Sequence, residues 1–173
     1  MVIRGKHLLI AAIVLLVLAG AGIGLWYYLR PTDENLIRGQ FAKFAELVTK
    51  SGKEGALPAA TRAKEISQLF TDRAVFDVDG LSWMAGPFTR KDLSANAFRA
   101  RAMLDRVKLA FDDLEIEVAP DRKTARIFLT ASLSGKTKDG SEFHEVRELE
   151  CAMFREDSGW VFDSFKIRQI IRK

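Results

Sequence analysis

The N-terminal part of the chain is hydrophobic without interruption. The run from Leu8 to Leu29 has 22 residues and no charge, and Trp26, Tyr27 and Tyr28 stand near its end. As a helix it measures about 33 Å, close to the ~30 Å hydrocarbon thickness of a bilayer, and aromatic rings favour the headgroup level. The pattern predicts a short N-terminus (1–7), a transmembrane helix (8–29) and a domain over residues 30–173.

The charges beside this segment predict its orientation. Arg4 and Lys6 precede it, whereas Asp33 and Glu34 follow soon after it. The positive-inside rule then keeps the N-terminus in the cytoplasm and places the domain outside. We expect a single-pass signal anchor in a bacterial inner membrane, with the domain in the periplasm. The alternative is a cleaved signal peptide, with 8–18 as its apolar core and 19–21 as its cleavage site.

Two glycines inside the segment bear on association. Gly20 and Gly24 have the spacing that lets two membrane helices approach closely, which would allow a homodimer. Ordinary membrane-helix composition explains the same glycines.

Beyond Arg30 the apolar positions first follow a helical period. Spacings of three and four predict a helix from about residue 33 to 50, a second from Pro58, and a third opened by the capping box Thr89–Asp92. The apolar faces of the three helices are, in order, Leu36, Ile37, Phe41, Phe44, Leu47 and Val48; Ala59, Ala63, Ile66, Leu69 and Phe70; and Leu93, Ala97, Ala100 and Leu104.

Other segments follow the strand period. A short strand is predicted at 74–78, with 82–85 as a brief hairpin partner, and four long strands at 107–118, 124–134, 142–154 and about 160–170. The apolar phase slips after Phe111, which predicts a β-bulge at Asp112–Asp113. Together these elements predict an α+β fold, a cone-shaped domain of three helices packed on a curved antiparallel sheet.

The charge composition of the domain argues against a nucleic acid partner. The net charge of +4 comes from 27 Lys and Arg against 23 Asp and Glu, and without Arg4, Lys6 and Arg30 the balance is 24 to 23. A nearly neutral domain lacks the positive field that binds a phosphate backbone, so we expect no nucleic acid partner.

Three stretches give this order of elements a family likeness: Leu69–Phe76, Gly86-Pro87-Phe88 and Gly159–Phe165. Over about residues 34–172 the chain resembles the nuclear transport factor 2-like superfamily, also described as cystatin-like or SnoaL-type. The resemblance implies a curved sheet around helices whose opening holds a small ligand or a segment of a partner. Members include isomerases, dehydratases, polyketide cyclases and assembly components, and fold alone does not choose among them.

The catalytic residues of the superfamily's best-known enzyme type are not all present. Ketosteroid isomerase uses a tyrosine with aspartates, but the only tyrosines are Tyr27 and Tyr28. Asp77, Asp79 and Asp163 remain as carboxylates, with turn or rim roles as the alternative. His144 has the strand phase that faces away from the helices, and Cys151 has the core phase. No metal-ligand spacing occurs, so we expect neither a metal nor a cofactor.

Glu145 and Arg147 are the most informative polar residues. They share a strand face with Phe143 and Leu149, the face assigned to the cone. Their opposite charges predict either a rim salt bridge or the polar floor of a ligand site. Trp83 would be an apolar wall of that site, or ordinary core, and Asp79 is a further candidate ligand-binding residue.

The resulting hypothesis is a membrane-anchored, non-catalytic domain that binds an envelope protein partner or a small apolar ligand. One alternative is a tethered isomerase, dehydratase or hydrolase of the same superfamily. The other is an assembly component resembling the periplasmic cone domains of type IV secretion systems.

Overall fold

The computed structural model describes residues 32–77 and 86–170, and Asp33–Lys173 form one compact unit. The predicted membrane segment 8–29, with Gly20 and Gly24, lies outside the described residues, as do Asp79 and Trp83. In the part that is described, no helix is long and apolar enough to cross a bilayer.

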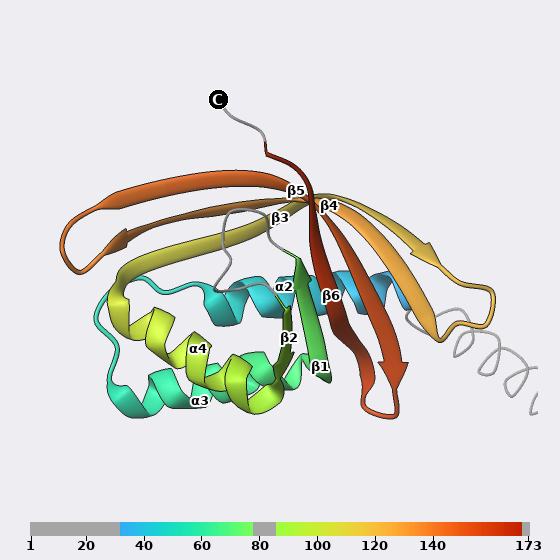
Figure 1. The fold of residues 1–173 in the computed structure, drawn as a ribbon, viewed down its shortest axis with the longest axis horizontal. Coiled ribbons are helices and arrows are strands. Elements are labelled where there is room, and N and C mark those ends of the chain that lie inside the picture. Colours follow the sequence, from blue (N-terminus) through green and yellow to red (C-terminus); the bar gives the residue numbers. More distant parts are fainter. Residues whose placement is uncertain (1–31, 78–85, 171–173) are drawn as a thin grey trace, which may run out of the picture. The chain divides into compact units, whose positions relative to one another are not determined.

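Two helices, two strands, a third helix and four strands follow one another along the chain, an order typical of an α+β domain (Figure 1). Their bounds are α2 Asp33–Val48, α3 Ala56–Gln68, β1 Phe70–Asp77, β2 Gly86–Thr89, α4 Arg90–Met103, β3 Leu104–Val118, β4 Thr124–Thr137, β5 Glu142–Glu156 and β6 Gly159–Ile170.

The six-stranded sheet is mixed, which corrects the prediction of an antiparallel one. Its order is β2-β1-β6-β5-β4-β3, and β1 runs parallel to β6 while every other pair is antiparallel. Hairpin signals specify pairing between successive strands only. The parallel pair joins segments about ninety residues apart, Phe70 with Phe162 for example, and no local turn reports it.

Several element ends differ from those predicted. Leu69 and Phe70 are buried as expected, but α3 stops at Gln68 and Phe70 already belongs to β1. Leu104 opens β3 instead of closing α4, and Leu36 is 38% exposed. The hairpin partner of β1 is β2 instead of residues 82–85, which lie outside the described part.

Two local predictions are confirmed. Thr89 and Asp92 form the capping box at the start of α4, each side chain bonding the other's backbone N–H. The register of β3 against β4 shifts between Asp112 and Glu115, and Asp113 has φ of 54°. A bulge of this kind increases local twist and bends the strand. The long strands β3–β5 curve over α2 in Figure 1.

Phenylalanine rings from α2 and from the sheet pack against one another in the core. Eight rings form one network with centroid separations of 4.9–6.4 Å, within the range of favourable aromatic contacts. They are Phe41 and Phe44 of α2, Phe70 and Phe76 of β1, Phe88 of β2, Phe111 of β3, and Phe162 and Phe165 of β6. The core of the cone is therefore made of side chains.

Candidate functional site

Glu145 and Arg147 of β5 pair on the concave face, as their strand phase predicts. The Nε and Nη2 atoms of Arg147 donate to one carboxylate oxygen of Glu145, at 3.0 and 2.8 Å. They share the face of Cys151 and Met153, which are fully buried in the core. The pair thus lies on the helix-covered side of the sheet.

Arg147 is not fully satisfied by this pairing. Its side chain is 21% exposed, yet its Nη1 atom is buried and has no hydrogen-bond partner among residues 32–77 and 86–170. The backbone register places Arg147 between Ala131 of β4 and Ile170 of β6, and Ala131 in turn pairs with Phe111. An unpaired buried N–H group is costly, so this nitrogen is the place where an oxygen acceptor would be most favourable.

Arg101 of α4 is the opposite case. It is only 4% exposed, and its Nε and Nη2 atoms each donate a hydrogen bond of 2.9 Å to one of the two carboxylate oxygens of Glu54. Its Nη1 atom donates to the carbonyls of Leu47 and Val48, at the open end of α2. Lys50 completes the cluster by donating to the carbonyls of Arg101 and Leu104. The cluster ties α2, the loop after it and α4 together.

A second buried carboxylate fixes the start of α2. Asp33 accepts from Arg122 Nε at 2.6 Å, from Arg155 Nη1, and from Trp160 Nε1 at 3.4 Å. The hydrogen bond from Arg122 is the largest cause that lowers the pKa of Asp33, and the bond from Arg101 does the same for Glu54. Both carboxylates are held charged, which suits structural ion pairs and does not suit a general base poised near neutral pH.

The other candidate groups have structural or surface positions. Cys151 is buried in the core, as its strand phase predicts, and burial raises the pKa of its thiol. His144 is exposed and pairs with Ser134 in the register of β4 and β5, while Asp163 accepts from the Thr71 hydroxyl. Within residues 32–77 and 86–170, no group of His, Cys, Asp and Glu could hold a metal.

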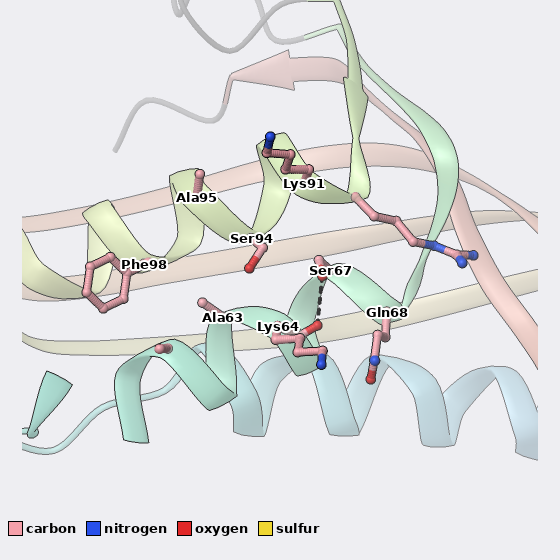
Figure 2. A pocket seen from close by; sticks show the side chains of 10 residues that line it. Ala63, Lys64, Ser67, Gln68, Lys91, Ser94, Ala95 and Phe98 are labelled. Carbon is pink, nitrogen blue, oxygen red and sulfur yellow. Dashed lines mark hydrogen bonds between the residues drawn. The ribbon is translucent and has the colours of Figure 1, made fainter. Parts of the chain in front are cut away.

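Two grooves open on the surface of the described unit. One, of about 640 Å³, runs between α3 and α4 (Figure 2), and is lined by residues such as Ala63, Ser67, Ser94 and Phe98. The other, of about 720 Å³, lies where Thr49–Ser51 meets the start of β3 and the hairpin of β4 and β5. It carries Lys108 and His144, together with the ion pair of Arg106 and Glu142.

The sequence predicts some of this site and misses the rest. It places Glu145 beside Arg147 because the two are neighbours on one strand face. It misses the Arg101 cluster because Glu54 and Arg101 are 47 residues apart. One buried arginine on α4 leaves no periodic signal in the sequence, and the groove between α3 and α4 depends on how two helices pack.

The fold has many relatives among solved structures, at low sequence identity. A candidate aromatic ring hydroxylase from Novosphingobium aromaticivorans aligns with a TM-score of 0.65 and 15% identity, over 82% of this chain and 90% of that one. An NTF2-like protein with a cystatin-like fold from the same organism gives 0.58 and 17%, over 86% of each chain. A candidate scytalone dehydratase, also from this organism, gives 0.61 and 8%, over 80% and 84%.

Comparison with curated protein sequences finds no match. The SnoaL-like domain family, in contrast, matches residues 59–166, which run from α3 into β6 and make up more than half of the chain. The matched residues include most of α3, the whole of α4 and five complete strands of the sheet. The chain therefore belongs to the SnoaL-like domain family.

Proposed function

We propose that this SnoaL-like domain is a non-catalytic binding module that the N-terminal segment 8–29 holds at the outer side of a bacterial inner membrane. Its partner is another envelope protein. The observation that carries the proposal is the network of phenylalanine rings between α2 and the sheet. The ring of Phe44, for example, contacts those of Phe70, Phe111, Phe162 and Phe165. In this proposal the packed rings occupy the interior of the domain, and the partner binds on the outer surface.

The ionisable groups support the same conclusion. The carboxyl groups of Asp33 and Glu54 are held charged by arginines, and the pKa of Asp92 is lowered by its hydrogen bonds with Thr89 in the helix cap. Each of these groups stabilises the fold. General acid and base catalysis instead needs a group whose pKa lies near the working pH, inside a pocket that admits a substrate.

Photocrosslinking in intact membranes tests the proposal. Benzoyl-phenylalanine is introduced into the full chain at Ser94, on α4, or at Ser132, on the face of β4 opposite the buried Ile127 and Leu129. We expect light-dependent capture of one envelope protein from at least one of these surface positions. Efficient crosslinking that recovers no protein neighbour from either position would contradict the binding module.

A tethered isomerase or dehydratase is the second candidate, and Arg147 is the observation that favours it. Its buried, unpartnered Nη1 atom would stabilise an oxyanion at the mouth of the cone. The similarity to a candidate scytalone dehydratase is compatible with this reading. An enzyme would lose turnover in Arg147→Met, whereas the binding module would still be crosslinked to the same neighbour.

A further inference from the structure

The groove between α3 and α4 belongs to the outside of the cone. All of its lining residues come from these two helices, and none comes from the sheet. In Figure 2 the two helices face one another across it, with Phe98 at one end and Gln68 at the other. The groove is thus separate from the concave face that carries Arg147.

The floor of the groove is small and mainly apolar. Ala63 and Ser67 are buried, Ser94 points toward them from α4, Ala95 is exposed on α4, and Phe98 is 37% exposed. Short side chains let the backbone of a bound segment come close, and an exposed phenylalanine ring offers an apolar anchor. From Ala60 to Gln68 the floor is about 12 Å long, two turns of an α-helix.

The rim of the groove is positively charged. Lys64 of α3 and Lys91 of α4 are exposed, and Arg90 stands beside them, while no carboxylate contributes to the lining. Arg90 is already paired with Asp72 and Glu156, each at 3.2 Å. Neither lysine makes an ion pair with any residue of the described ranges. Two lysines without an ion pair in the described ranges therefore stand beside an apolar floor, and Lys91 also has an electrostatic interaction with its neighbour Asp92.

We propose that this groove docks an acidic amphipathic helix of the partner protein, with its apolar stripe on the alanine floor and Phe98, and its carboxylates beside Lys64 and Lys91. This inference rests on the proposed binding function and names the chemistry of the partner. Charge complementarity of this kind steers association and selects the partner. An anionic bilayer fits less well, because a flat surface does not enter a groove between two helices and would leave the apolar floor uncovered.

Crosslinking from the groove tests the proposal in the full chain, in native membranes. Benzoyl-phenylalanine at Ser94 probes the groove, and the same residue at Ser132 is the matched control on the sheet. We expect the Ser94 product to map, by mass spectrometry, to one partner segment with net negative charge and apolar residues at helical spacing. Raising the salt from 50 to 500 mM on isolated membranes should lower its yield.

Charge reversal supplies the decisive comparison. The double variant K64E/K91E should lower the Ser94 yield at least tenfold and leave the Ser132 yield unchanged, while K64R/K91R keeps both. Circular dichroism checks that the variants fold. The docking proposal would be contradicted if charge reversal left the Ser94 crosslinking yield unchanged. It would also be contradicted if the Ser94 product contained lipid, a second copy of this chain or a neutral segment. Capture from Ser132 alone would contradict the docking groove and remain consistent with the binding module. Capture from neither position would contradict both proposals.

Discussion

Arg101 and Arg147 both pair with a glutamate, yet their surroundings differ. All three guanidinium nitrogens of Arg101 donate hydrogen bonds, to the Glu54 carboxylate on one side and to the carbonyls of Leu47 and Val48 on the other. Arg147 donates two hydrogen bonds to one oxygen of Glu145, whereas its Nη1 atom is buried and has no partner in the described part of the chain. A saturated ion cluster stabilises the fold by itself, whereas an unsaturated one gains most from a group that arrives later.

We expect the substitution Arg101→Met to cause the largest loss of folding stability. It leaves the Glu54 carboxylate without its main partner and uncovers the last carbonyls of α2, so the free energy of unfolding should fall by about 3–5 kcal/mol. Urea denaturation of the full chain measures it. Arg126→Met is the matched control, since Arg126 is 62% exposed and lies 3.4 Å from Glu150. A loss below about 1 kcal/mol would show that the cluster is not structural.

The change Asp33→Asn should be the next largest. The amide cannot replace the charge-assisted bonds that the carboxylate accepts from Arg122 and Arg155, so the start of α2 loses its anchor. We expect the free energy of unfolding to fall by about 1.5–3 kcal/mol. Amide hydrogen exchange should show faster opening of the first turn of α2. Unchanged protection there would place the anchor elsewhere.

Acid should weaken the same two clusters. The pKa values of Asp33 and Glu54 are lower in the folded chain than their ordinary values of 3.8 and 4.5. The unfolded chain therefore takes up these protons first as the pH falls. The stabilisation is complete above the ordinary values and is lost as the pH drops through the folded ones. Stability of the full chain between pH 6 and pH 2 measures this, and the double variant D33N/E54Q should flatten the decline. An equally steep decline in that variant would assign acid unfolding to other groups.

The smallest effect is predicted for Arg147→Met. Removing an arginine with an unpaired buried nitrogen costs little, because the change also removes the unsatisfied donor and leaves Glu145, which is half exposed, in contact with water. We expect the free energy of unfolding to change by less than about 1 kcal/mol. Thermal denaturation beside Arg101→Met makes the comparison direct. A loss as large as that of Arg101→Met would remove the distinction between the two arginines.

The sequence is informative where the structure depends on near neighbours. The capping box Thr89–Asp92, the bulge at Asp112–Asp113 and the pairing of Glu145 with Arg147 each involve residues within three positions of one another. These are set by local periodicity and turn chemistry. These three predictions are confirmed.

Features that join distant segments escape such reasoning. The parallel pairing of β1 with β6 and the bond of Arg101 to Glu54 depend on how the helices and the sheet assemble. The groove between α3 and α4 has the same origin, because it arises from the packing of two helices whose sequences show nothing unusual. Tertiary packing decides these features, and no pattern along the chain reports them.

The filled interior of the cone is the claim on which the binding module depends, and xenon under pressure tests it most directly. Crystals of the native chain should take up no xenon between α2 and the sheet. Crystals of Phe41→Ala should hold it in the cavity left beside Phe111 and Phe162, since empty apolar cavities bind this gas. Xenon among the phenylalanine rings of the native chain would reveal a ligand-sized space there and would contradict the account.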